Sequence, residues 1–184
     1  MSINDPLSPI RLQLMWDRLI AVVEEQALAL MRTGFSTSTR EAGDLSAGVF
    51  DLKGDMLAQA VTGTPGHINS MARSVRHFLE KFPAPTMKEG DIFLTNDPYS
   101  VNGAISHQND WLMLMPIYKD GRVIAWSAMF GHMTDVGGKV PGSQVSDALS
   151  IWEEGIRIPP IKIFERGVLN ETALDVILNN TRTP

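Results

Sequence analysis

The sequence of 184 residues contains no cysteine. A disulfide framework and a thiolate metal site are therefore excluded, and any bound metal must use nitrogen and oxygen ligands. Because disulfides belong to oxidising compartments, the lack of cysteine favours a cytoplasmic protein.

Long apolar runs and an excess of basic residues are missing as well. No stretch approaches the roughly 18 uninterrupted apolar residues of a membrane span, and the first residues lack a basic segment followed by an apolar block. Lys and Arg number 16 against 21 Asp and Glu, which gives a net charge of −5. Neither sign forms a long run, so we expect no export signal, no membrane span and no nucleic-acid partner.

A phosphate-binding loop ending in Gly-Lys-Ser or Gly-Lys-Thr is also missing, so we do not expect ATP to bind to this chain. The residues that are present are 43% hydrophobic, which suffices for a buried core of ordinary size. We expect one domain that spans residues 1–184.

Apolar spacing predicts three helices and at least two hairpins. The helices follow from helical periodicity and cap residues over residues 8–33, 66–82 and 170–178. Two apolar runs, 45–51 and 56–61, form the first hairpin, and 91–94 forms a short strand. The strongest hairpin joins Trp111–Tyr118 to Val123–Phe130 through Asp-Gly, which supplies the positive φ of a tight turn.

These elements predict an α+β fold, in which the long N-terminal helix packs on a mixed or antiparallel sheet built from hairpins. Residues 133–151 are rich in glycine, serine and proline. A long irregular segment in a compact domain is often functional, and we expect this glycine-rich loop to cover a site.

The second hairpin indicates where that site lies. His107 stands three residues before Asp110, just ahead of the first arm, and His132 follows the second arm. Antiparallel pairing makes the start of one arm a neighbour of the end of the other, so the three side chains should converge. Two histidines and a carboxylate suit zinc, manganese or iron and leave positions open for water or substrate. The alternative is that these histidines are hydrogen-bonded structural residues.

Further carboxylates have two interpretations each. Asp97 in Asn-Asp-Pro-Tyr can stabilise a turn, or it can be a ligand, an orienting carboxylate or a base. Asp44, before the first hairpin, has the same ambiguity, and Asp135 could add an oxygen ligand or hold an imidazole in place. For His67 and His77 the structural interpretation is favoured, although His67 could face a pocket.

Several segments together resemble the hydantoinase B family, which includes subunits or regions of N-methylhydantoinases, 5-oxoprolinases, caprolactamase, and acetone and acetophenone carboxylases. The similarity runs from about Pro6 to Pro184 and is carried by Asn96–Tyr99, His107–Asp110, Gly131–Gly138, Pro141–Ser143, Glu154–Pro160 and Asn180–Pro184.

The resemblance implies a divalent-metal subunit, with zinc, manganese, iron and cobalt all open. It also implies a hydantoinase A-type partner that binds ATP with Mg²⁺ and activates the substrate. The family ligands fall on His107, Asp110 and His132, with Asp44 as a fourth. A metal-assisted opening of a cyclic amide such as a hydantoin or lactam is the implied reaction, with Asp97 or Asp135 as an orienting or proton-handling carboxylate.

Two other functions remain open at this point. One is a subunit of an ATP-dependent ketone carboxylase, and the other is a truncated, non-catalytic assembly module. The second is suggested by length, because members of the family typically have several hundred residues. The sequence also departs from the family pattern at Gly103–Ser106 and at Gly131, which leaves the substrate open.

Overall fold

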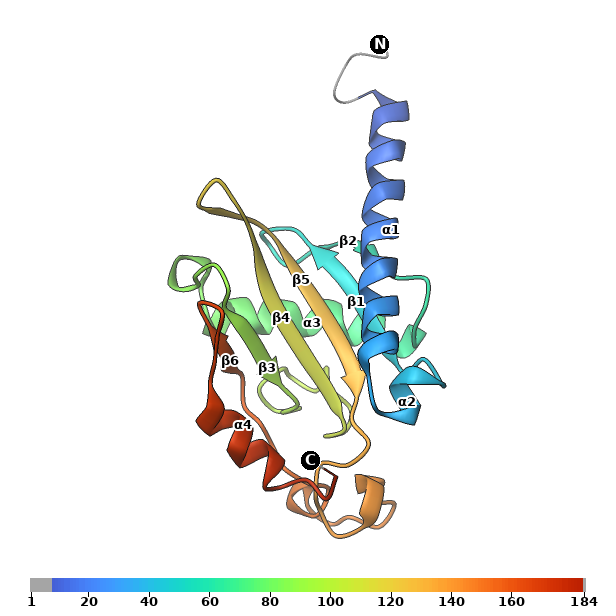
Figure 1. Ribbon diagram of the computed structural model, residues 1–184, viewed down its shortest axis with the longest axis vertical. Coiled ribbons are helices and arrows are strands. Elements are labelled where there is room, and N and C mark those ends of the chain that lie inside the picture. The colour runs from blue at the N-terminus through green and yellow to red at the C-terminus, as the bar shows by residue number, and fades with distance from the viewer. Residues whose placement is uncertain (1–7, 184) are drawn as a thin grey trace.

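The computed structural model describes residues 8–183. These have an α+β fold with one seven-stranded antiparallel sheet, in the strand order β2-β1-β5-β4-β3-β6-β7 (Figure 1). Residues 1–7, in which we expect no export signal, and Pro184, the last residue of the family-like segment, lie outside the described residues.

Helices and strands follow one another along the chain as α1 (Pro9–Thr33), α2 (Thr37–Arg40), β1 (Leu45–Phe50), β2 (Met56–Gln59), α3 (Pro65–Lys81), β3 (Ile92–Thr95), β4 (Asp110–Lys119), β5 (Arg122–His132), β6 (Ile161–Glu165), β7 (Val168–Leu169) and α4 (Glu171–Leu178). Short 3-10 turns cover Ala84–Thr86, Pro141–Ser143 and Ile151–Glu153.

The three predicted helices are confirmed together with two of their caps. Ser8 Oγ accepts the backbone N–H of Arg11 at 3.4 Å at the start of α1, and Asn170 Oδ1 accepts that of Ala173 at 3.1 Å at the start of α4. The four-residue helix α2 was not predicted, because so short a helix carries no measurable periodicity. Within residues 8–183, no helix has the length and apolar character that crossing a membrane would require.

The β4–β5 hairpin is longer than the sequence pattern predicts. Lys119 pairs with Arg122 across the two-residue turn, where Asp120 and Gly121 have φ values of 51° and 71°, as a tight hairpin requires. From there the pairing continues to Asp110 opposite His132. The predicted arms therefore extend, at the end opposite the turn, onto Asp110 and His132, two of the residues singled out as ligands.

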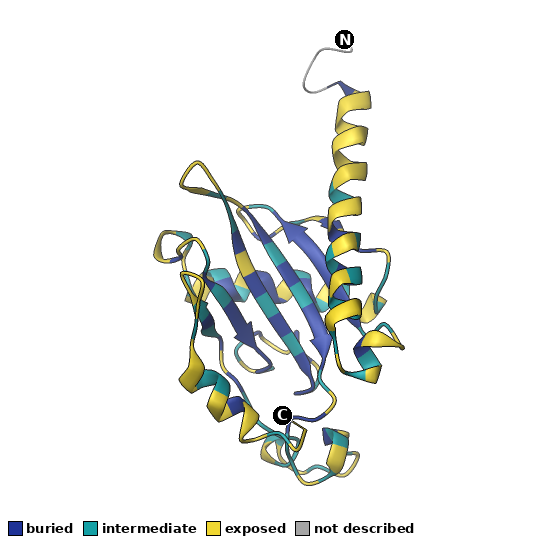
Figure 2. Ribbon diagram, in the orientation of Figure 1, coloured by how far each residue is buried: buried dark blue, intermediate teal, exposed yellow. Residues whose placement is uncertain are grey.

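Strand β1 is buried along its whole length because a helix covers each face of the sheet at this strand (Figure 2). Leu45, Ala47 and Val49 pack in clusters with Val23 and Ala27 of α1. Phe50 points the other way, into the main core formed with α3 residues that include Met71, Val75 and Phe78. Alternate side chains of a strand point to opposite faces, so α1 and α3 hold β1 between them.

Strands β6 and β7 were not predicted from the sequence. They are only five and two residues long, and β6 directly follows Pro159-Pro160, which is typical of an irregular segment. Pairing with β3 and the packing of Ile177 from α4 on Leu94 and Ile163 hold this edge of the sheet. Tertiary contacts, rather than local pattern, define these strands.

Candidate metal centre

The end of the second hairpin that lies opposite its turn brings together His107, Asp110 and His132. Asp110 opens β4 and His132 closes β5 as directly paired residues, and the backbone N–H of Asp110 donates to the carbonyl of His107 at 3.2 Å. One possible ligand atom from each of the three side chains lies within 4.8 Å of the others. The predicted convergence therefore exists.

Asp110 is the centre of this group. Its Oδ1 atom lies 3.1 Å from His107 Nε2 and 3.3 Å from His132 Nδ1, while its Oδ2 atom lies 3.5 Å from His67 Nε2. Asp110 is only 2% exposed. Asp110 is therefore a buried carboxylate surrounded by three imidazoles.

The imidazoles decide the charge of Asp110. Burial by itself raises the pKa of this carboxyl, but hydrogen bonds from His107, His132 and His67 outweigh burial and hold the pKa far below its usual value. The hydrogen bond to Asp110 in turn raises the pKa of His107, against the opposing effect of burial. Asp110 is therefore ionised at neutral pH and offers a negatively charged oxygen.

We expect the stability of the metal-free chain to fall as the pH rises above about 6.5, the ordinary pKa of histidine. Because the pKa of His107 is raised in the folded protein, the folded state binds more protons than the unfolded state between the ordinary and the raised value. The stabilisation is complete below the ordinary pKa and is lost as the pH passes the raised one. Melts of chelator-treated protein from about pH 5.5 to 9 measure this fall. A His107→Gln variant with the same pH profile would contradict it.

Asp44 lies beside the same group, as the family resemblance implies. Its Oδ2 atom is 3.5 Å from His132 Nδ1, and its Oδ1 atom accepts a hydrogen bond from Thr64 Oγ1 at 2.8 Å. The backbone N–H of His132 also donates to the carbonyl of Asp44 at 3.2 Å. Asp44 thus adds a second carboxylate beside the end of β5.

His67 completes the cluster, although the sequence favoured a structural role for it. It lies in the first turn of α3 and stacks on Phe130, with ring centroids 5.2 Å apart. The predicted first hairpin could have indicated this position, because the two ends of a hairpin lie side by side. In the structure the backbone N–H of Thr64, after β2, donates to the carbonyl of Leu45 in β1 at 2.8 Å. Residues just after β2 therefore lie beside Asp44. His77 instead pairs with Glu80 farther along α3.

Asp135 and Asp97 have other contacts. Asp135 accepts backbone N–H groups from Gly137 and Gly142, both at 2.8 Å, and pairs with Arg182. Asp97 accepts the N–H of Tyr99 and the hydroxyl of Ser100, and lies 3.9 Å from Arg157 Nε. Each carboxylate stabilises the turn that contains it. A role of Asp97 or Asp135 in the chemistry of the site stays a prediction.

The family model described as hydantoinase B/oxoprolinase matches residues 8–184. The chain belongs to this family. The beta subunit of caprolactamase from Pseudomonas jessenii is 32% identical over 96% of the chain. The crystal structure of the ATP-dependent caprolactamase from the same organism superposes with a TM-score of 0.83 at 30% identity over 97% of the chain. A nucleotide-free acetone carboxylase structure gives a TM-score of 0.85 over 96% of the chain at 24% identity, which is a likeness of fold.

This hydantoinase B chain is short relative to its relatives. It spans 29% of the length of the caprolactamase beta subunit, 30% of the matching chain of the caprolactamase structure and 23% of that of the acetone carboxylase. The matched stretch contains the complete cluster of histidines and carboxylates described above.

The glycine-rich loop of this hydantoinase B chain lies next to the cluster. Asn109, the neighbour of Asp110, donates its side-chain amide to the carbonyls of Met133 and Gly142 at 2.9 and 3.1 Å. The loop is thereby tied to the strand that carries the central carboxylate. That it covers the site stays a prediction.

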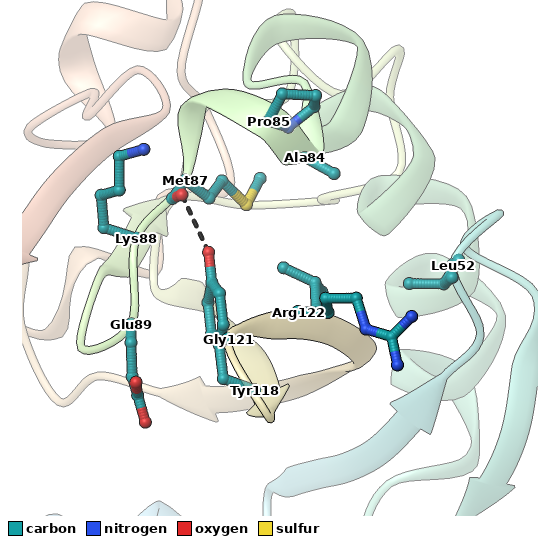
Figure 3. Close-up of a pocket in the computed structure, with 10 residues that line it drawn as sticks. Leu52, Ala84, Pro85, Met87, Lys88, Glu89, Tyr118, Gly121 and Arg122 are labelled. Carbon is teal, nitrogen blue, oxygen red and sulfur yellow. Dashed lines mark hydrogen bonds between the residues drawn. The ribbon is translucent and has the colours of Figure 1, made fainter.

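A hollow lies at the turn end of the β4–β5 hairpin (Figure 3). Its lining includes Lys88, Tyr118 and Arg122, and Tyr118 Oη donates to the carbonyl of Met87 at 2.8 Å. None of the residues that line it belongs to the histidine and carboxylate cluster. The candidate centre and this hollow are thus at opposite ends of the hairpin.

Proposed function

We propose that this chain is the metal-binding part of a B-type subunit in an ATP-dependent cyclic-amide hydrolase. It acts with a hydantoinase A-type partner, which binds ATP and Mg²⁺ and activates the substrate. The observation that carries the proposal is the buried, ionised carboxylate of Asp110 with His107 Nε2 at 3.1 Å and His132 Nδ1 at 3.3 Å.

The donors present fit a divalent transition metal. Imidazole nitrogen and carboxylate oxygen are the ligands that zinc, manganese, iron and cobalt share, so the set leaves the choice among these metals open. His107, Asp110 and His132 would hold the metal, with Asp44 as the fourth ligand. When bound, such a metal polarises a carbonyl group or makes a water molecule more acidic.

The remaining carboxylates orient the surroundings of the site in this proposal. Asp135 ties two glycine N–H groups of the loop after β5 to Arg182. Asp97 holds the turn after β3 and faces Arg157. Both side chains are buried, which suits positioning better than free exchange of protons with solvent.

Similarity to caprolactamase supports ring opening as the reaction, because caprolactam is a cyclic amide and the matched stretch carries the candidate ligands. The likeness to acetone carboxylase is one of fold, so it does not favour carboxylation over hydrolysis.

An activity assay with a partner tests the proposal. The metal-loaded chain is mixed with a hydantoinase A-type subunit and ATP, and hydantoin, 5-oxoproline and caprolactam are offered in turn. Ring-opened product is followed by mass spectrometry, with His107→Ala as the matched variant. We expect product formation that depends on both ATP and metal and that is lost in the variant.

Other outcomes point to the alternatives. Incorporation of labelled bicarbonate with a ketone substrate would indicate a carboxylase instead. Binding to the partner without turnover of any substrate, by a chain that holds its metal, would favour an assembly module.

A further inference from the structure

His67 is held in a way that distinguishes it from His107 and His132. Its ring stacks on Phe130 at an interplanar angle of 23°. Its Nε2 atom lies 3.5 Å from Asp110 Oδ2 and 3.6 Å from Asp44 Oδ1. Its other nitrogen, Nδ1, is buried and has no hydrogen-bond partner among residues 8–183.

This arrangement determines which ring nitrogen of a neutral His67, Nε2 or Nδ1, carries the proton. On Nε2 the proton points at two carboxylates, which are strong acceptors. On Nδ1 it would be a buried donor without an acceptor, and the lone pair of Nε2 would face carboxylate oxygens. The neutral tautomer with the proton on Nε2 is therefore favoured.

A histidine that binds a metal normally has a hydrogen-bond partner for its second ring nitrogen. Its lone pair faces the ion, and its other ring N–H donates to a carboxylate, a carbonyl or water, which fixes the ring. Among the described residues, His67 Nδ1 is the one imidazole nitrogen that is buried without such a partner. His67 lacks the support that a ligand histidine requires.

The two oxygens of each carboxylate, Asp44 and Asp110, face different histidines. Asp110 Oδ2 and Asp44 Oδ1 face His67, whereas Asp110 Oδ1 and Asp44 Oδ2 face His132 Nδ1 at 3.3 and 3.5 Å. We infer that His67 is a positioning residue whose Nε2–H is shared between Asp44 Oδ1 and Asp110 Oδ2. It turns the other oxygen of each carboxylate, Asp44 Oδ2 and Asp110 Oδ1, toward the metal position without binding the metal. This inference rests on the proposed function, since it assumes that the cluster binds a metal.

Metal affinity and a cobalt spectrum test the inference in the full 184-residue chain. His67→Phe keeps a ring to stack on Phe130 but removes the donor, and His67→Gln restores an N–H donor. His77→Phe, on the same helix but away from the cluster, is the matched control. Affinity for Zn²⁺ is measured by chelator competition, and the visible absorption of bound Co²⁺ reports the ligand set.

For His67→Phe we expect one metal per chain bound about 10- to 100-fold more weakly, the usual effect of losing a residue that orients a ligand. His67→Gln should bind within about threefold of the parent and give the parent Co²⁺ spectrum, and His77→Phe should match the parent. If His67→Phe does not fold, His67→Leu gives the same comparison.

Two results would overturn the inference while leaving the proposed function intact. Loss of metal or a changed Co²⁺ spectrum in His67→Gln would make His67 a ligand, and parent affinity in His67→Phe would leave it without a role. A parent chain that binds neither Zn²⁺ nor Co²⁺ would instead overturn the proposed function and the inference together.

Discussion

Replacing His107 and His132 together by alanine is expected to abolish binding of a divalent metal and the stabilisation that the metal gives. The parent should hold about one ion per chain. At a free metal concentration 100 times the Kd, binding stabilises the folded state by about 2.7 kcal/mol. For a chain of this length that raises Tm by roughly 5–11 °C. Elemental analysis and melts with and without metal measure both effects.

The variant loses both imidazole donors that face Asp110 Oδ1, so its Tm should not respond to metal. His77→Ala is the matched control, because His77 pairs with Glu80 outside the cluster, and it should keep both the metal and the shift in Tm. A parent that contains no metal and cannot be reloaded would contradict the prediction. The alternative of a non-catalytic assembly module would then be favoured over the proposed function.

Trp126→Ala is expected to cost about 3–5 kcal/mol of unfolding free energy, the range measured when large aromatic side chains are removed from cores. Trp126 lies in β5, is fully buried, and belongs to the main core with Phe50 and the buried face of α3. Alanine would leave a cavity that neighbouring strands, fixed by their pairing, can fill only in part. Urea unfolding at neutral pH measures the loss.

Trp16→Ala provides the matched control for the same chemical change. Trp16 lies on α1 and is 58% exposed, so its removal should change the unfolding free energy by no more than about 0.5 kcal/mol. Equal losses for Trp16→Ala and Trp126→Ala would contradict the assignment of the core to the α3 face of the sheet.

The second hairpin and its ligands could be predicted from sequence because their order is local. Asp120-Gly121 fixes the turn, and a two-residue turn fixes the register of both arms. Asp110 and His132 lie at nearly the same distance from that turn, and one register shift between Ile117 and Tyr118 places them directly opposite each other. The long helices α1 and α3 were predictable for a similar reason, since periodicity and caps lie within each segment.

Residues of the first hairpin show what local reasoning misses. Asp44 and His67 reach the cluster only because β1 pairs with β5 across a sequence separation of about eighty residues, with Leu45 opposite Gly131. No periodicity in either segment records that pairing. The same holds for β6, which becomes a strand because the edge of β3 accepts it.

Local sequence was enough to predict the α+β class, the three main helices, the two hairpins and the convergence of His107, Asp110 and His132. All of these follow from turn chemistry, caps and spacing along short segments. Only the tertiary structure shows that the two hairpins pair with each other through β1 and β5, that Asp110 is buried among three imidazoles, and that Asp135 binds loop amides and Arg182. Those outcomes depend on pairing and burial between distant segments, which local sequence does not encode.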